Sequence, residues 1–316
     1  MQIVDFNATH IEQASQIAKQ NYEEERRFVH ALPRISSVPN LTPYAENLLG
    51  VAAVDGAVML GFLCSVPPFK NAFGSTSATG VFSPMGANGA IGRDRAKIYA
   101  RMYQEAGDKW AHAGATSHAV SLYAHDKEVQ GQFFHYGFGM RCVDAIREMD
   151  EIDSASCDGY EFSELTSAAL LHVLPLDHML DAHMARSPTF ILRPSDTPES
   201  FVRRSERSHS IYLVAKTHEQ VVAYLRAELT GETFIRDMPG YLHINGAFCL
   251  PEHRGKGLSQ QLLHELVKKL RAQGYTRLGV DFESINPIAD RFWLKHFKPY
   301  TCGVVRRIDD YALTRR

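Results

Sequence analysis

An internal duplication constrains the fold of this chain more than any other feature of its sequence. The segment KEVQGQFFHYGF, residues 127–138, can be laid over NPIADRFWLKHF, residues 286–297, with an offset of 159 residues, from 127 to 286. In this alignment Phe134 matches Trp293 and Phe138 matches Phe297. Since the chain has 316 residues, the sequence predicts two tandem copies of one fold rather than two unrelated domains.

Strand-like and helix-like stretches alternate in both halves, which predicts an α/β chain with mostly antiparallel sheets flanked by helices. In the first half we expect strands at 51–54, 58–65, 117–123 and 140–147, with helices at 10–30, 93–113 and 127–136. In the second half we expect strands at 210–216, 221–229, 241–250, 277–283 and 302–308, with helices at 257–273 and 287–297. The polar segment 150–160 is the expected linker, so the predicted domains are residues 1–150 and 151–316.

Composition and charge exclude several classes of protein. The formal net charge is −2, whereas nucleic-acid binders usually carry a basic stripe. There is no apolar run long enough to span a membrane, and the first residues do not have the pattern of a signal peptide. The five cysteines are odd in number and lack CxxC spacing, which argues against a disulfide framework or a zinc site. We therefore expect a reduced, cytoplasmic protein without nucleic-acid or membrane partners; a homodimer is left open.

A basic turn with two glycines, RGKGLS at 254–259, joins a predicted strand directly to a predicted helix. It is not a Walker A loop, because the position five before Gly255 is Leu250. It is not a dinucleotide fingerprint either, because the position three after Gly257 is Gln260 and the preceding strands look antiparallel. The first amides of a helix have no partner within the helix, and glycines allow a phosphate to approach them closely. The turn is therefore interpreted as a phosphate loop of a third kind; the alternative is a solvated turn that only starts a helix.

Two motifs in this order resemble those of the GCN5-related N-acetyltransferase (GNAT) superfamily. The pyrophosphate loop of that family reads R/Q-x-x-G-x-G/A, and here Arg254, Gly257 and Ser259 occupy its positions, with Ser in place of the last Gly or Ala. The second family motif, N-x-x-A-x-x-F-Y-x-x-x-G-F, resembles residues 286–297. The resemblance covers about residues 200–308 and implies a tandem member of the family whose second domain is the active one.

The resemblance implies that the second domain binds acetyl-CoA, uses no metal and transfers the acetyl group to a small-molecule or protein amine by direct attack. The pantetheine arm of acetyl-CoA would lie along the strand near its end. The pyrophosphate would be bound by the loop, and Asn286 would contact the cofactor where the strands part. The implied cofactor-binding residues are Ala247, Phe248, Cys249, Arg254, Gly255, Lys256, Gly257, Leu258, Ser259, Gln260 and Asn286.

The catalytic residues are less well defined by the sequence. A general base is useful because the attacking amine must be neutral. The family commonly places a Glu on the strand before the loop, and here the corresponding residue is His243; Glu283 and Asp281, at the end of the next strand, are the alternatives. The family's general acid is a Tyr that is replaced here by Trp293, whose indole N–H cannot deliver a proton at neutral pH. This replacement leaves a non-catalytic acyl-CoA-binding or scaffold protein as the alternative function.

The first half retains only the second motif, as FFHYGF at 133–138. Its glycines Gly86, Gly89 and Gly92 lack the loop pattern, so we expect a turn there and a degenerate GNAT domain. Two acidic clusters are expected to lie on solvated helices: YEEERR at 22–27, and the group Asp177, His178, Asp181 and His183.

Overall fold

The computed structural model describes residues 1–153 and 157–314 of the chain. Contacts between Cα atoms divide it into two units, each made of several segments. Unit 1 comprises residues 1–144, 282–290 and 299–316, and unit 2 comprises residues 145–281 and 291–298. The predicted domains, 1–150 and 151–316, stay a prediction. They differ from the two units because residues 282–290 and 299–316, from the second repeat, belong to unit 1.

Unit 1 contains helices on both sides of mostly antiparallel strands. Its helices are α1 (Ile11–Phe28), α2 (Thr42–Glu46), α3 (Arg95–His112) and α4 (Lys127–His135). Its strands are β1 (Gln2–Asp5), β2 (Val51–Asp55), β3 (Val58–Leu63), β4 (Phe69–Lys70), β5 (Thr79–Ser83), β6 (Asn88–Ala90), β7 (Ser117–Tyr123), β15 (Thr301–Arg307) and the first part of β8 (Gly139–Glu148). One sheet has the order β1-β2-β3-β6, and in the other β5 pairs in parallel with β7.

The last strand of the chain completes the sheet of unit 1. Residues Thr301–Arg307 of β15 pair antiparallel with Tyr123–Ser117 of β7 along their whole length, and β15 also pairs with the start of β8. Val304 is fully buried in the same core cluster as Trp110 and Val120. The strand predicted at 302–308 therefore exists, but it belongs to the sheet built by the first half of the sequence.

Unit 2 is a mixed sheet with helices on both faces. Its helices are α5 (Leu174–Met184), α6 (Pro198–Arg207), α7 (Leu258–Ala272) and the greater part of α8 (Pro287–His296). Its strands are β9 (Glu161–Glu164), β10 (Ile211–Thr217), β11 (Gln220–Glu228), β12 (Tyr241–Cys249) and β13 (Arg277–Glu283), while β14 (Lys298–Pro299) lies where the units meet in sequence. Strands β9 to β12 are antiparallel neighbours in the order β9-β10-β11-β12, and β12 and β13 are parallel.

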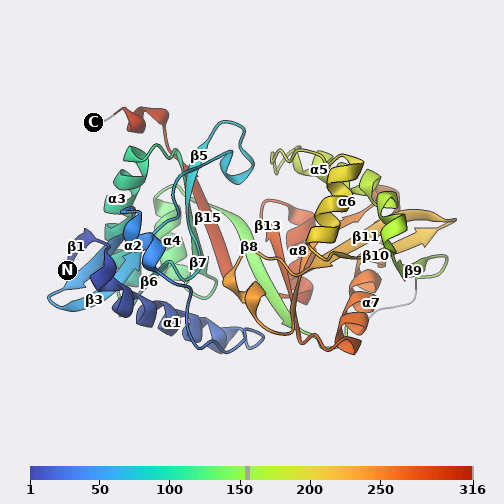
Figure 1. Ribbon diagram of the computed structural model, residues 1–316, viewed down its shortest axis with the longest axis horizontal. Coiled ribbons are helices and arrows are strands. Elements are labelled where there is room, and N and C mark those ends of the chain that lie inside the picture. The colour runs from blue at the N-terminus through green and yellow to red at the C-terminus, as the bar shows by residue number, and fades with distance from the viewer. Residues whose placement is uncertain (154–156, 315–316) are drawn as a thin grey trace. The chain divides into compact units, whose positions relative to one another are not determined.

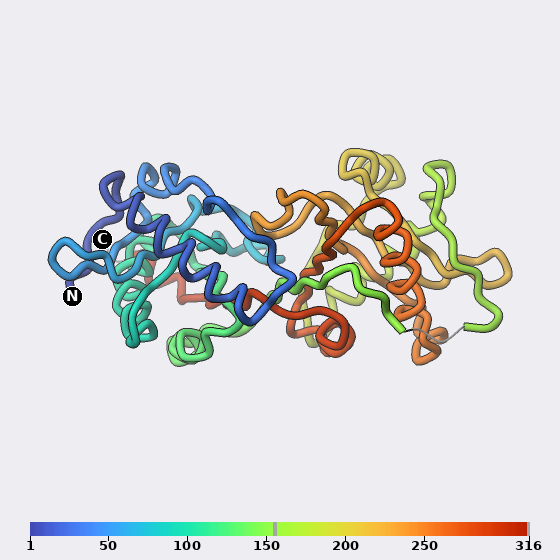
Figure 2. Tube along the Cα trace, turned by 90° about the horizontal axis from the view of Figure 1, so that it is seen from below, coloured from blue at the N-terminus to red at the C-terminus, as the bar shows by residue number. Residues whose placement is uncertain are grey.

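The two faces of this sheet have different character. Figure 1 shows α5 and α6 on one face and α7 on the other. Leu262, Leu263, Leu266 and Leu270 of α7 are buried, as their helical spacing predicts, and Gly274 ends this helix with φ of 87°. Figure 2 shows α7 beside the chain that leaves β8, where His264 Nδ1 lies 2.6 Å from Ile152 O. The face toward α5 and α6 is polar by contrast, because alternate residues of β11 there are Tyr224, Arg226 and Glu228.

No helix among the described residues is long and apolar enough to cross a membrane.

Candidate functional site

The basic turn lies in unit 2 between the end of β12 and the start of α7. Gly255 and Gly257 have φ of 75° and 81°, left-handed values that other residues rarely adopt. Gly257 is the N-cap of α7, and no side chain of residues 1–153 or 157–314 caps this end of the helix. The two glycines are therefore required by the backbone path, which turns the loop amides toward the helix start.

Six consecutive backbone amides, from Gly255 to Gln260, have no hydrogen-bond acceptor in the described part of the chain. The next amide, that of Gln261, donates to Gly257 O at 2.9 Å, so the helical hydrogen bonds begin there. A row of free amides at a helix N-terminus binds anions, since the N–H groups and the helix dipole both favour negative charge. The Lys256 ammonium, which contacts the Tyr160 hydroxyl at 3.4 Å, adds positive charge. This geometry fits a pyrophosphate.

The strand before the loop has an open edge. β12 pairs in parallel with β13 only from Tyr241 to Ile244, opposite Arg277 to Val280. Beyond this point, β11 is the only strand among the described residues that pairs with β12. Because the amide of Leu250 bonds to Val222 O in β11, the alternation of an antiparallel strand turns the backbone groups of Ala247 and Cys249 away from β11.

Part of this edge is already used by the loop itself. Arg254 Nε donates to Cys249 O at 2.9 Å, and its guanidinium lies 5.4 Å from the centre of the Phe248 ring. Arg254 thus fixes the strand end to the loop, and the backbone of Ala247 is left for an added partner. An arm with amide groups, such as pantetheine, can pair there as a short extra strand.

The corresponding strand of unit 1 has no such opening. The amide of Ile91 bonds to Leu60 O in β3, so the backbone groups of Ala90 point away from β3. Both of them are bonded to one side chain of α1: Asn21 Nδ2 donates to Ala90 O at 3.0 Å, and Asn21 Oδ1 accepts from Ala90 N at 3.1 Å. The Asn21 carboxamide therefore covers the edge that is free in unit 2.

The start of α3 in unit 1 also differs from the start of α7. Its first residue, Arg95, forms a bidentate pair with Glu24 at 2.8 and 3.0 Å, and its Nε lies 3.2 Å from the Asp126 carboxylate. Two carboxylates beside a helix N-terminus disfavour a phosphate there. The amides from Gly92 to Lys97 also have no acceptor among the described residues, so unit 1 differs from unit 2 in its covered strand edge and in the carboxylates beside the helix start.

His243 lies in a line of three polar side chains in unit 2. Its Nε2 is 2.8 Å from Asp281 Oδ1, and its Nδ1 is 2.6 Å from the Tyr241 hydroxyl. Because a carboxylate only accepts, Nε2 carries the proton, and in the neutral ring Nδ1 accepts from Tyr241. His243 is 1% exposed, whereas the Asp281 side chain is 23% exposed and lies just beyond the last pair of β12 and β13. Asp281 is therefore open to solvent on one side, and His243 contacts its carboxylate from the buried side.

Gly279 makes room for this line of side chains. A Cβ atom at residue 279 would lie 1.8 Å from the Tyr241 hydroxyl and 2.8 Å from His243 Nδ1. We expect Gly279→Ala to lower the free energy of unfolding by about 1–3 kcal/mol, because overpacking forces buried groups to move. Gly131→Ala in α4, where nothing lies within 4 Å, should leave stability unchanged or raise it. Urea unfolding of both variants checks this, and equal effects would contradict the placement of Tyr241.

Glu283 is the last residue of β13, and Asn286 follows this strand; both belong to the segment 282–290 of unit 1. Both oxygens of Glu283 are bonded to Arg141, at 3.1 and 3.0 Å, so this carboxylate is held as an ion pair. Asn286 is mostly buried, and its Oδ1 accepts from Ala289 N at the start of α8. The predicted roles of Glu283 as a base and Asn286 as a cofactor contact stay predictions.

Trp293 and Cys249 are the other two predicted residues whose chemistry bears on acyl transfer. Trp293 is buried and contacts Phe292 and Phe297, with ring centres 4.8 and 5.5 Å apart, so it contributes to packing. Burial raises the pKa of the Cys249 thiol, although Arg254 opposes this shift. Cys249 therefore stays protonated at neutral pH and is poorly suited to form a covalent acyl intermediate, which favours direct transfer.

The expectation that the two acidic clusters lie on solvated helices was wrong for one carboxylate in each cluster. Asp177 is buried, since its carboxylate accepts from Tyr224 and Arg204. Glu25 is also buried and pairs with His125. Helical spacing alone does not reveal that a strand or a loop supplies a partner on the covered side of a helix.

Comparisons with known proteins agree with this geometry. The model of the family described as "Acetyltransferase (GNAT) family" matches residues 178–297, from α5 to the end of α8. Residues 178–297 of this chain belong to that family. The matched family is a family of acyl-CoA-dependent N-acetyltransferases.

Solved structures confirm the predicted fold class, an α/β protein of two GNAT-like domains. A GCN5-related N-acetyltransferase from Sphaerobacter thermophilus superposes with a TM-score of 0.60 at 10% identity and covers 96% of this chain and 95% of its own. A glucosamine N-acetyltransferase region of a fungal multi-domain β-N-acetylglucosaminidase superposes with a TM-score of 0.54 at 12% identity, over 96% of this chain but only 38% of that protein. At these identities the likeness concerns the fold alone.

Proposed function

We propose that this protein is an N-acyltransferase, most simply an N-acetyltransferase, whose active site is in unit 2 and whose acceptor is a small-molecule or protein amine. The observation that carries the proposal is the row of free amides from Gly255 to Gln260, placed directly after a strand with an open edge. The amides would hold the pyrophosphate of acetyl-CoA, and the backbone of Ala247 would pair with its pantetheine arm. Acetyl-CoA supplies an activated thioester.

The residues at the parting of β12 and β13 would handle the proton of the acceptor. The nitrogen of a neutral amine attacks the thioester carbonyl, an N–C bond forms, and the C–S bond breaks with release of the CoA thiolate. Asp281 would accept the proton that the amine loses, while His243 Nε2 donates to the other side of the same carboxylate group. A thiol pKa of about 8.5 makes the thiolate a fair leaving group, so the absence of a Tyr at Trp293 weakens the acid step without preventing the reaction.

The Trp at residue 293 supports a second candidate function. Because Trp293 is packed between aromatic rings and cannot donate a proton, the site could bind acyl-CoA without turning it over. Such a protein would act as an acyl-CoA-dependent scaffold.

Release of free CoA thiol from acetyl-CoA in the presence of a panel of amines separates the two functions. We expect amine-dependent thiol release, and we expect isothermal titration to give one CoA per chain because Asn21 covers the edge in unit 1. Tight binding without release for any amine would favour the scaffold. Two equivalent binding sites per chain would contradict the assignment to unit 2 alone.

A further inference from the structure

We propose that Arg226 and Glu228 are positioning residues for the acyl end of the cofactor. They hold Asn245, the bulged residue of β12, and so fix the point at which the open edge begins. This inference rests on the proposed binding of acyl-CoA to unit 2. It adds a role for a set of buried charges on β11 that neither the loop nor the His243–Asp281 pair explains.

The bulge in β12 lies where the pairing of β12 with β13 ends, while its pairing with β11 continues. Arg226 pairs with Gly246 and Ala227 pairs with Ile244, so Asn245 is the extra residue. Ile244 is also the last residue of β12 that pairs with β13. A bulge bends a strand and re-aims the residues beyond it. The geometry at Asn245 therefore decides how the backbone of Ala247 faces an added partner.

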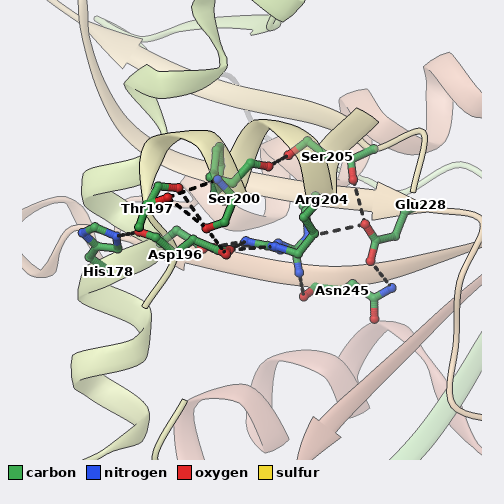
Figure 3. Close-up of polar contacts among 12 residues, drawn as sticks. His178, Asp196, Thr197, Ser200, Arg204, Ser205, Glu228 and Asn245 are labelled. Atoms are coloured by element: carbon green, nitrogen blue, oxygen red, sulfur yellow. Dashed lines mark hydrogen bonds and ion pairs between the residues drawn. The ribbon is translucent and has the colours of Figure 1, made fainter. Parts of the chain in front are cut away.

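Three side chains hold this bulge from two directions. Arg226 Nη2 donates to the backbone oxygen of Asn245 at 2.7 Å. The Asn245 side chain donates from Nδ2 to Glu228 Oε1 and to Thr230 Oγ1, both at 2.6 Å. Figure 3 shows Arg204, Glu228 and Asn245 joined in one network of polar contacts. Both the main chain and the side chain of the bulged residue are thus fixed by β11 and the residues that follow it.

The charges that hold Asn245 are themselves buried. The side chains of Arg226 and Glu228 are 10% and 8% exposed, with Arg226 Nε 3.8 Å from Glu228 Oε2 and Arg226 Nη1 3.9 Å from Asp177 Oδ1. Ser210 donates to the other oxygen of Glu228 at 2.7 Å. The Asp177 carboxylate accepts in turn from Tyr224 and Arg204. Buried ion pairs contribute little net stability compared with apolar packing, so stability alone does not account for this network.

The guanidinium of Arg226 lies where it can bind the backbone of the bulged residue, Asn245, and not where it would form close ion pairs. Arg226 Nε and Nη1 are buried and make no hydrogen bond within the described part of the chain, which is unfavourable for N–H groups. The one good hydrogen bond of Arg226 goes to Asn245 O. A Cβ at residue 246 would lie 3.4 Å from Arg226 Cζ and Nε, so the guanidinium packs against the backbone of Gly246. The network is arranged around the strand that would receive the acyl arm.

The test compares a ligand that uses the strand edge with one that does not. Acetyl-CoA engages both the loop and the edge, whereas ADP offers a pyrophosphate without a pantetheine arm. For Glu228→Ala and Asn245→Ala we expect the Kd for acetyl-CoA to rise about tenfold, the loss expected for one hydrogen bond to a charged group, while the Kd for ADP stays within about twofold. Glu228→Gln should restore most of the affinity for acetyl-CoA, because an amide oxygen still accepts from Asn245.

Several results would decide the question. If both Ala variants bind acetyl-CoA and ADP more weakly to the same extent, the network only stabilises the fold. If both variants bind the two ligands as tightly as the unmodified protein does, the network has no positioning role. Asn245→Ala leaves the buried charges intact, so it remains informative if Glu228→Ala does not fold. As a control, Arg271→Ala in α7 removes an exposed ion pair with Glu151 and should change neither the Kd for acetyl-CoA nor the Kd for ADP. Failure of the unmodified protein to bind either ligand would instead overturn the proposed function.

Discussion

Replacement of Gly257 by glutamate should abolish the stabilisation of this protein by acetyl-CoA. A ligand present at 100 times its Kd raises the free energy of unfolding by about 2.7 kcal/mol, and the unmodified protein should show a rise of this order in thermal unfolding. Gly257 has φ of 81° and is the N-cap of α7. A glutamate there would be strained, and its carboxylate would repel a phosphate at the amides of residues 255–260.

The matched control is Gly274→Glu at the other end of the same helix. Gly274 has φ of 87°, and nothing lies within 4 Å of a Cβ at that position. Both variants carry the same backbone strain and the same added charge, so both should unfold at a lower temperature than the unmodified protein without ligand. Only Gly257→Glu should lose the response to acetyl-CoA. A normal response in Gly257→Glu would mean that the pyrophosphate binds elsewhere.

The loop could be predicted from the sequence because its chemistry is local. Two glycines, a strand end and the start of an amphipathic helix are contiguous, and the free amides follow from the first turn of α7. Helices α1, α3, α4, α7 and α8 and the longer strands were predicted for the same reason, since their apolar residues recur with the period of the element; α2 and α6 were not predicted. The fold class followed from the repeat of these elements in the two halves.

Features that depend on distant segments were not predicted. The exchange of β15 into unit 1 depends on its pairing with β7, which no local pattern encodes. The short strands β5 and β6 flank Gly86, in a stretch that was predicted as a turn before a helix; Gly86 and Gly92 do have positive φ, but Gly89 lies within β6. Strands of three to five residues are too short for a periodic signal.

The sequence contains one signal of the positioning network. After the exposed Gln220, strand β11 is apolar except that Tyr224, Arg226 and Glu228 occur at alternate positions, and alternation places all three on one face of a sheet. Polar residues on the covered face of a central strand conflict with ordinary patterning, and such conflicts occur at functional sites. The bulge at Asn245, by contrast, follows from a register between strands that the sequence alone does not give.

Substitution of Asp281 shows which of the three candidate bases, His243, Asp281 or Glu283, takes the proton. We expect Asp281→Asn to lower kcat on the order of 10²–10⁴-fold, the usual contribution of a general base, with little change in the Kd for acetyl-CoA. The substitution keeps the shape of the side chain and a hydrogen-bond acceptor for His243 Nε2, so stability should be nearly unchanged. Thiol release with an amine that the unmodified protein accepts gives kcat, and titration gives the Kd.

The other two candidates supply the controls. Glu283→Gln should leave kcat close to that of the unmodified enzyme, because both oxygens of Glu283 are held by Arg141. His243→Gln should have an intermediate effect, since it removes the group that orients Asp281 but not the carboxylate itself. A larger loss in Glu283→Gln than in Asp281→Asn would assign the base to Glu283. If Asp281→Asn were fully active and His243→Gln inactive, the base would be His243 and not Asp281.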